Sequence, residues 1–389
     1  MIDDDLVRSL LRDLVAIDSV NPTLVPGARG EAAAGEFLRE FLRRQGMDAE
    51  LQEAAPGRPN VLAFLGPDAA PARGAAKARA ALAILAHIDT VGAGDMESPF
   101  TPREREGRLY GRGALDIKSG VAAMCAAAVA VLHEHVPLRR PLLIAAVADE
   151  ECNSIGTEAL LRECDAEAAV VLEPTDLKLC VAHKGYAWFE VVTHGRAAHG
   201  SLPEEGRDAI RMMGRVLNLL DALDRKLASL APHPRLVHGS LHASLIRGGQ
   251  ELSSYPAECR LQIERRTLPG ESAAHVEAEL RGLLEGLRAR DPEFRATARG
   301  LAFRPAYEIP EDAPLVKTVS SAIRSVTGSV ELSGMAAWTD TALLAAAGIP
   351  GVVFGPRGRG LHGAEEYVHL DSVAICAEVL LQVIKRICT

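Results

Sequence analysis

Residues 82–94 read LAILAHIDTVGAG, and in this stretch an aliphatic run ends on a histidine and a carboxylate. The run from Leu82 to Ala86 is typical of a strand that is buried in a sheet. His87 and Asp89 follow at once, and because they are two residues apart their side chains lie on one side of an extended chain. Both side chains are costly to bury, so we expect them to have partners in a functional site.

The same pattern recurs along the chain and predicts an α/β fold. Short apolar runs bounded by turn residues alternate with helical patterns, and this alternation is typical of a sheet that helices cover on both faces. The strands are predicted at 60–65, 81–86, 141–148, 168–172 and 351–354, and the helices at 29–45, 118–135, 154–163, 339–347 and 370–386.

The middle of the chain has a different pattern. Three stretches alternate apolar and polar residues, as strands with one face in water do, and two long helical patterns separate them. We therefore expect an α+β domain at 185–295 that is inserted into a larger domain made of 1–184 and 296–389. The strands of the insertion are predicted at 185–195, 235–246 and 257–267, and its helices at 207–230 and 272–289.

Charge and hydropathy exclude several classes of partner. The 389 residues carry 43 basic and 52 acidic side chains, a net charge of −9, which disfavours a nucleic acid or an anionic membrane as a partner. The longest apolar stretch, 120–132, is too short to span a membrane and is predicted to be a buried helix. Residues 66–80 have low complexity and are predicted to form a surface loop.

The cysteines and the first residues predict a cytoplasmic protein. The seven cysteines are scattered and form no CxxC pair, which is typical of reduced thiols. The first residues, MIDDDLVRSLLRDLVAI, have the pattern of an amphipathic helix and not that of a signal peptide.

Four of the predicted buried strands are followed by acids or by an imidazole. The carboxyl ends of strands in an open α/β sheet converge on one crevice, so we expect these side chains to lie close together. A further acid, Asp116, lies just ahead of the apolar helix. The residues that follow the four strands are His87 and Asp89, then Asp149, Glu150 and Glu151, then Glu173, and finally His362 after a glycine-rich loop.

So many carboxylates in a small volume would repel one another and raise their pKa values, and divalent cations remove that repulsion. Imidazole and carboxylate ligands without thiolates suit Zn²⁺ or a similar ion, and the acids exceed what one ion needs, so two ions are predicted. Taken singly, each residue has an ordinary explanation as a hydrogen-bonded histidine, a helix cap or an acid in a first helical turn. Only their joint occurrence at successive strand ends predicts a metal site.

Seven motifs then occur in order along the whole chain: LAHIDTV, GRGALDIKSG, ADEECNSIGTEAL, VVLEPT, HGRAAHGSLPEEGRDAI, ERRTLPGE and GPRGRGLHGAEEYV. With these motifs the chain resembles the acetylornithine deacetylase, succinyl-diaminopimelate desuccinylase and glutamate carboxypeptidase family of di-zinc metallohydrolases. The resemblance implies a zinc-peptidase-like mixed sheet flanked by helices, in a catalytic domain that an α+β lid and dimerisation domain interrupts.

The resemblance also implies a role for each residue at the strand ends. Glu150 would be the general base that takes a proton from water, and Asp89 would hold the His87 ring in the tautomer that leaves its other nitrogen free for metal. The two ions would be zinc, with cobalt as a possible substitute. The implied ligands are His87 and Glu173 for one ion, Glu151 and His362 for the other, and Asp116 as the bridge between them.

In the inserted domain, the resemblance implies two residues that contact the substrate. His199 would polarise the substrate carbonyl, in many members from the partner subunit, which implies a homodimer through the lid. Arg266 matches an arginine that binds a substrate carboxylate, although an ordinary surface arginine is the alternative. Ser253 stands where the family often has Asn, which puts an asparagine contact to the substrate in doubt.

The implied function is that of a metal-dependent amidohydrolase that removes the acyl group from a small N-acyl amino acid, as an acetylornithine deacetylase does. The same metal site would also serve a dipeptidase or a carboxypeptidase. A binding protein that has lost catalysis is the alternative from another class, and the complete ligand set with Glu150 argues against it. A nicotinamide-dependent enzyme is disfavoured because no G-x-G-x-x-G follows the first strands.

Overall fold

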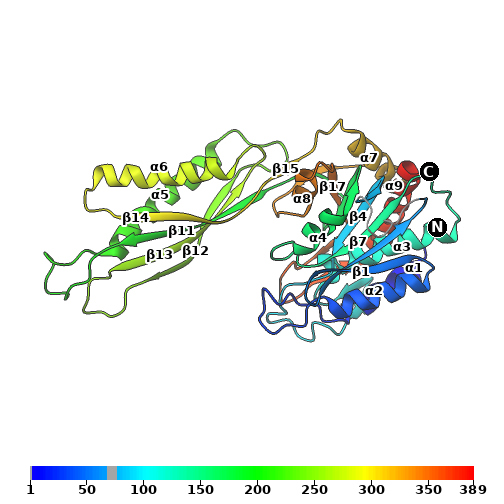
Figure 1. Cartoon of the computed structure of the whole chain (residues 1–389), viewed down its shortest axis with the longest axis horizontal. Helices are drawn as coiled ribbons and strands as arrows, with labels where there is room; N and C mark the ends of the chain where they lie inside the picture. The colour runs from blue at the N-terminus through cyan, green and yellow to red at the C-terminus, as the bar shows by residue number, and fades with distance from the viewer. Residues whose placement is uncertain (1, 68–76) are drawn as a thin grey trace. The chain divides into compact units, whose positions relative to one another are not determined.

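The structure is a computed structural model that describes residues 2–67 and 77–389 (Figure 1). The chain divides into two compact units. The larger unit consists of Met1–Val181, Ile309–Ser333 and Thr339–Thr389, and the smaller unit of Ala182–Glu308 and Gly334–Trp338. Most of the predicted loop at 66–80, namely residues 68–76, lies outside the described residues.

A mixed sheet forms the centre of the larger unit, in the strand order β1-β2-β7-β4-β9-β17-β10. The inner strands β7, β4, β9 and β17 are parallel to one another, so their carboxyl ends lie at the same edge. All residues of β4 and β7 are buried, as expected of strands covered on both faces. The bounds are β1 Asp48–Ala55, β2 Arg58–Leu65, β4 Leu82–His87, β7 Leu142–Val147, β9 Ala169–Leu172, β10 Leu179–His183 and β17 Gly351–Phe354.

Helices cover both faces of this sheet (Figure 1). On one face α3 (Ser119–His133) packs against α9 (Leu370–Cys388), and α1 (Asp4–Val15) and α7 (Pro314–Thr327) contact this pair. On the other face α4 (Ile155–Glu163) and α8 (Thr341–Ala346) pack on alternate side chains of the strands, such as Leu62 and Leu85. The helix α2 (Ala32–Arg44) contacts β1 and β2.

The apolar stretch predicted to be a buried helix is α3. Together with the short helical turn η1 (Ala114–Lys118), it is long and apolar enough to cross a membrane, but 89% of the most apolar window is buried inside the protein. It is therefore a core helix of the larger unit, and its alanines allow the close contact with α9.

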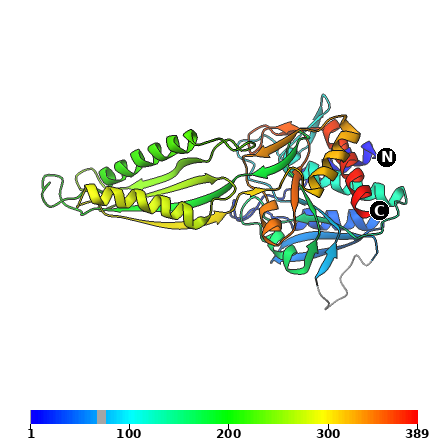
Figure 2. The same ribbon diagram turned by 90° about the horizontal axis from the view of Figure 1, so that it is seen from above.

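The smaller unit is an antiparallel sheet in the order β12-β13-β11-β14 with two helices on one face (Figure 2). The helices contribute Met213, Val216, Leu280 and other apolar residues to a core against the central strands β11 and β13. The bounds are β11 Gly185–His194, β12 Ser240–Gly248, β13 Glu258–Thr267, β14 Ala296–Arg304, α5 Ala209–Ser229 and α6 Ala273–Arg290.

The predicted border at 295 leaves out one strand of this unit. β14 begins at Ala296 and pairs with β11 along its length, so the smaller unit continues to Glu308. The sequence did not show this strand, because β14 is an edge strand whose central residues are exposed and do not alternate between buried and exposed positions. The short segment Gly334–Trp338 also belongs to the smaller unit.

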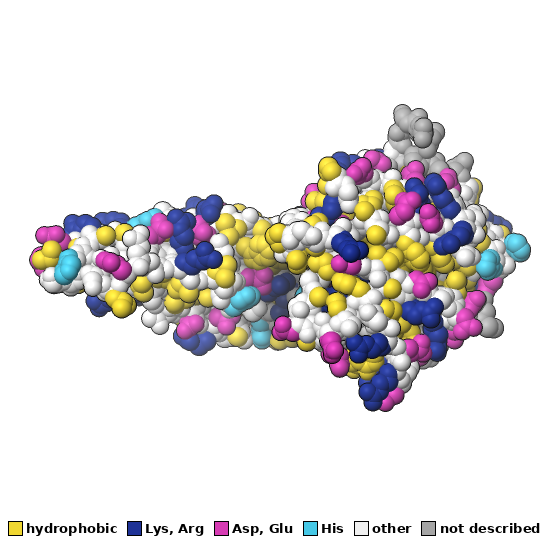
Figure 3. Space-filling model, turned by 90° about the horizontal axis from the view of Figure 1, so that it is seen from below, with side chains coloured by type: hydrophobic (Ala, Val, Ile, Leu, Met, Phe, Trp, Pro, Cys, Tyr) yellow, Lys and Arg dark blue, Asp and Glu magenta, His cyan; other side chains and the backbone are white. Residues whose placement is uncertain are grey.

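The predicted fold class is confirmed: a mixed sheet flanked by helices with an inserted α+β unit. On the face drawn in Figure 3, basic and acidic side chains are interspersed, in keeping with the 43 basic and 52 acidic residues of the chain.

Candidate metal centre

The residues predicted at the strand ends lie together at one edge of the larger unit's sheet. His87 is the last residue of β4, Glu150 and Glu151 follow β7, and Glu173 follows β9. These strands are parallel, so the chain delivers the side chains to the same edge.

Asp116 lies between two groups of candidate ligands. Its Oδ1 is 3.4 Å from His87 Nε2, and its Oδ2 is 3.3 Å from His362 Nε2. His362 Nε2 is also 3.3 Å from Glu151 Oε2. Within each group the ligand atoms lie within 4.8 Å of one another, the first group being His87, Asp116 and Glu173 and the second Asp116, Glu151 and His362.

The chemistry of these groups fits divalent cations. The donors are imidazole nitrogens and carboxylate oxygens, which are ligands that zinc takes in hydrolytic sites. Oε1 of Glu151 is buried, and among the described residues it has no hydrogen-bond partner. A buried carboxylate oxygen without a donor is costly, and a bound cation satisfies it.

The same crowding of buried carboxylates shifts the pKa values of the groups in the centre. Burial, and then the charge of Glu173, raise the pKa of Glu150 well above its ordinary value. Burial and the charges of Asp116 and Glu151 likewise raise the pKa of Glu173. Hydrogen bonds to Asp116 and Glu151 raise the pKa of His362 to about 10. The edge of the sheet therefore carries a negative potential that bound cations would balance.

Asp89 holds both His87 and the segment that carries Glu150. Nδ1 of His87 is 3.0 Å from the backbone oxygen of Asp89 and 3.5 Å from its Oδ1, so Nδ1–H can donate there while Nε2 faces Asp116. The carboxylate of Asp89 accepts hydrogen bonds from the backbone N–H groups of Glu150 at 3.1 Å and Glu151 at 3.3 Å. One side chain thus orients an imidazole and fixes the loop after β7.

Behind Asp89 lies a buried polar network that the sequence analysis did not find. Nδ2 of Asn21 donates to Asp89 Oδ2 and to Asp149 Oδ1, both at 2.8 Å. Arg58 donates to Asp149 Oδ1 at 2.9 Å and forms a two-armed ion pair with Glu31. The one signal in the sequence is that Arg58 lies just ahead of the apolar run predicted at 60–65, and it is the first residue of β2. Nothing in the local pattern connects Asn21 or Glu31 with the site.

Two residues of the centre have left-handed backbone conformations that are unusual outside glycine. Asp149 has φ of 67° and His362 has φ of 56°. Each such conformation costs about 1–3 kcal/mol and persists only where the surroundings impose it, as is common at functional sites.

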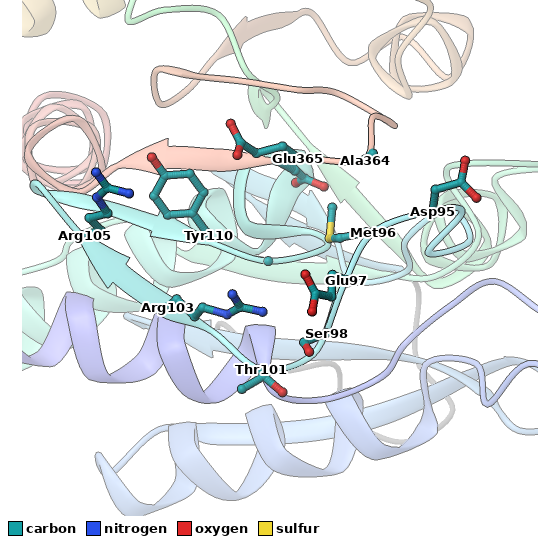
Figure 4. Close-up of a pocket in the computed structure, with 12 residues that line it drawn as sticks. Asp95, Met96, Glu97, Ser98, Thr101, Arg103, Arg105, Tyr110, Ala364 and Glu365 are labelled. Carbon is teal, nitrogen blue, oxygen red and sulfur yellow. The ribbon is translucent and has the colours of Figure 1, made fainter.

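A cavity of about 380 Å³ lies beside the loop that leads to Asp116 (Figure 4). Its wall consists of the segment after β4, the hairpin of β5 (Arg103–Arg105) and β6 (Arg108–Tyr110), and the segment after His362. Figure 4 shows Met96, Glu97 and Glu365 around this space. The cavity has both acidic and basic lining residues.

The two residues predicted to contact the substrate from the lid belong to the smaller unit. His199 lies in an exposed loop, where its Nδ1 is 2.7 Å from Ser201 Oγ. Arg266 is on β13, with Nε 2.7 Å from Glu264 Oε1 and its guanidinium 5.6 Å from the centre of the Tyr186 ring. The structure thus brings together Glu150, Asp89 and the five predicted ligands within the larger unit, and describes His199 and Arg266 within the smaller unit.

Comparison with known proteins identifies relatives along the whole chain. A sequence profile of the peptidase family M20/M25/M40 matches residues 83–386. The acetylornithine deacetylase of Myxococcus xanthus is 29% identical over 395 residues, which cover 98% of this chain and 97% of the relative.

Solved structures share the fold. A tripeptidase of Staphylococcus aureus superposes with a TM-score of 0.81 at 19% identity, covering 100% of this chain and 99% of the other. A dinuclear metal-binding peptidase of the M20 family from Bacillus subtilis has a TM-score of 0.73 at 16% identity, covering 99% and 98%.

Proposed function

The chain belongs to peptidase family M20/M25/M40, and from this premise we propose that it removes the acyl group from small N-acyl amino acids, as an acetylornithine deacetylase does. Membership of the family makes it a hydrolase of amide bonds. The observation that carries the proposal is that Asp116 belongs to two groups of candidate ligands. Glu150 lies at the same edge of the sheet, and its carboxyl group belongs to neither group.

In this proposal the centre would hold two divalent ions, zinc or cobalt. His87 and Glu173 would hold one ion, Glu151 and His362 would hold the other, and Asp116 would be the ligand shared by both. The support is the distance of 3.3–3.4 Å between each oxygen of Asp116 and an imidazole nitrogen, together with Oε1 of Glu151, which no donor in the described residues reaches.

When bound, the two ions would supply Lewis acidity, which would polarise the amide carbonyl and lower the pKa of a water. Glu150 takes the proton of the attacking water and then donates it to the amine nitrogen that leaves. Asp89 positions this base, since it accepts the hydrogen bond of the Glu150 backbone N–H. His87 keeps its Nε2 toward the centre because Nδ1–H donates to Asp89.

The smaller unit supplies substrate contacts and the dimer interface in this proposal. His199 polarises the substrate carbonyl from the partner subunit, and Arg266 binds the substrate carboxylate. In the described part of the chain, the hydrogen bonds of the His199 ring are made by Nδ1 alone, which leaves Nε2 for a substrate. The edge strand β12 exposes Leu245 and Ile246, and such an edge can pair with a second copy.

A cytoplasmic location is the last part of the proposal. All seven cysteines are free thiols in the structure, and six of them are buried. Reduced, unpaired cysteines are typical of proteins that stay in a reducing compartment.

A panel of substrates tests the proposed activity. The metal-stripped protein is reloaded with Zn²⁺ or Co²⁺ and given N-acetylornithine, N-succinyl-diaminopimelate and a set of dipeptides. We expect the highest kcat/KM for an N-acyl amino acid. Hydrolysis confined to the peptides would favour the peptidase alternative, and a metal-loaded protein that is inactive on a broad panel would contradict catalysis.

A further inference from the structure

Arg112 and Glu366 form a buried ion pair between two loops of the metal centre. Arg112 is 2% exposed and Glu366 is 1% exposed, and Nη1 of Arg112 donates to Oε2 of Glu366 at 2.7 Å. Desolvating two charges offsets most of their attraction, so net stability is a poor explanation for a pair of this kind. Its contacts indicate what else it does.

The carboxylate of Glu366 holds the loop that carries Asp116. Its Oε1 accepts from the backbone N–H groups of Leu115 at 2.8 Å and Asp116 at 3.1 Å, and its Oε2 accepts from Gly113 at 3.1 Å. The loop is tightly wound, because Gly113 has φ of 78° and a Cβ there would lie 2.7 Å from Thr90. Since the amide of Asp116 is itself a donor, the carboxylate fixes the backbone of the residue that lies between the two ligand groups.

The guanidinium of Arg112 holds the loop that carries His362. Its Nη2 donates to the backbone oxygen of Gly363 at 2.9 Å, directly after His362. The side chain of His362 is 54% exposed, so packing contributes little to its position. Its backbone is left-handed, which the surroundings must impose. The hydrogen bond from Arg112 therefore restrains the backbone that carries this histidine, together with the one that Gly363 N–H donates to the backbone oxygen of Gly360 at 2.9 Å.

We propose that Arg112 and Glu366 are positioning residues that set the spacing between Asp116 and His362, and so determine the affinity of the second ligand group for its ion. This inference rests on the proposed function, because it assumes that both groups bind metal. His87 is held by β4, and Glu173 comes directly after β9. In the described structure, Arg112 and Glu366 make no hydrogen bond to either residue. The first group is therefore expected to depend less on the pair.

The test compares Glu366→Gln with Glu365→Gln. Glu366→Gln keeps the size of the side chain but removes its charge opposite Arg112 and turns an amide NH₂ toward the loop N–H donors. Glu365 is the matched control, because it is the adjacent residue, is exposed and lines the cavity in Figure 4 without taking part in the ion pair. Zn²⁺ binding to the metal-stripped full chain is measured by equilibrium dialysis in zinc-buffered solutions, with circular dichroism as the check on folding.

We expect two ions for the wild type and for Glu365→Gln. For Glu366→Gln we expect the second ion to bind about 10–100-fold more weakly, the usual effect of losing a partner of a metal ligand. The first ion, which shares only Asp116 with the second, should weaken clearly less. Unchanged affinities, or equal weakening of both ions, would overturn the inference while leaving the proposed function intact. A wild type that binds no zinc overturns the proposed function and the inference together.

Arg112→Lys serves as the second variant in case Glu366→Gln does not fold. Lysine keeps a positive charge beside Glu366 but has no planar fork to reach Gly363 as well. We expect it to weaken only the second ion. If the folded Arg112→Lys protein binds both ions as the wild type does, the pair does not position His362 and the inference is wrong.

Discussion

At the scale of single residues, the base Glu150 gives the sharpest test of the proposed mechanism. Its carboxyl belongs to neither ligand group, so Glu150→Gln should retain two bound ions. General-base catalysis contributes about 10²–10⁴-fold, so kcat should fall by at least about 100-fold. Glu151→Gln is the comparison, because it should lose affinity for one ion. A near-normal kcat for Glu150→Gln would contradict the assigned role.

Asn21 gives a second prediction at this scale. Asn21→Ala removes the donors that join Asp89 to Asp149 and leaves two buried carboxylates without them. Because hydrogen bonds to charged groups contribute about 1.5–3 kcal/mol each and two are lost, the free energy of unfolding should fall by about 3–6 kcal/mol in urea denaturation of the metal-free protein. Asn218→Ala, at an exposed position of α5, is the control and should stay within about 0.5 kcal/mol of the wild type.

Most of the metal-centre residues that the sequence could predict lie at or after the ends of parallel strands, and Asp116, ahead of α3, is the exception. His87, Glu151 and Glu173 were found because the ends of such strands must meet. Asn21, Arg58 and Glu366 were not found, because their partners are remote in sequence and no local periodicity marks a hydrogen bond between loops. Glu366 forms its ion pair with Arg112, 254 residues away.

At the scale of elements, the strands and helices that could be predicted from the sequence are those with a buried face. The strand predicted at 351–354 is β17, Gly351–Phe354, and the helix predicted at 154–163 is α4, Ile155–Glu163, because both have a pattern that burial imposes. The exposed edge strand β14 and the two-residue strand β18 (Gly358–Arg359) have no such pattern. Edges and short pairings depend on neighbours that the local sequence does not specify.

The other edge of the small sheet carries the prediction for the dimer. On β12, Ile246 is 54% exposed, and Ile246→Lys places a charge where an edge-to-edge dimer would bury this strand. Sedimentation should show the wild type as a dimer and the variant shifted toward monomer. Leu301→Lys, on β14 at the opposite edge, is the matched control. If both variants sediment as the wild type does, β12 does not form the interface.

Subunit mixing tests the loop of His199. His199→Ala should lose kcat while its metal content stays unchanged, because the side chain is outside both ligand groups. If His199 acts from the partner subunit, a heterodimer of His199→Ala with Glu150→Gln has one site with both residues intact. Mixed subunits should then regain part of the activity. Differently tagged chains show whether the subunits exchange. If they exchange and the mixture is still inactive, His199 acts on the site of its own chain or has no role in catalysis.

At the scale of the whole molecule, the sequence predicted two units because two hydrophobic patterns alternate along the chain. Fully buried runs form the larger sheet, and half-buried alternation forms the smaller one. These two patterns could not locate the C-terminal border of the smaller unit, because its last strand, β14, has neither pattern. The return of Gly334–Trp338 to the smaller unit is a tertiary contact that no local pattern indicates.

The acids and histidines of the metal centre predict how stability depends on pH once the ions are removed. Burial and neighbouring charges raise the pKa values of Glu150 and Glu173 in the folded chain above the ordinary 4.5. A carboxyl group with a raised folded pKa stabilises the fold when it is protonated, and this contribution is lost as the pH rises from the unfolded value toward the folded one. The hydrogen bonds of His362 raise its pKa to about 10, so its contribution is complete below 6.5 and is lost as the pH rises toward 10.

As the pH rises from 5 to 8, the stabilising contributions of the protonated carboxyl groups and of protonated His362 both decrease, and the metal-free protein becomes less stable. In the metal-loaded protein, the positive charge of the ions would take the place of those protons. We expect the metal-free protein to melt at a lower temperature than the zinc-loaded protein at pH 8. The difference should narrow toward pH 5, where protons compete with metal for the same carboxylates. Differential scanning calorimetry of the metal-free and zinc-loaded proteins from pH 5 to pH 8 measures this difference in melting temperature. A difference that is constant with pH, or that widens as the pH falls, would mean that these acids are not crowded around a shared metal centre.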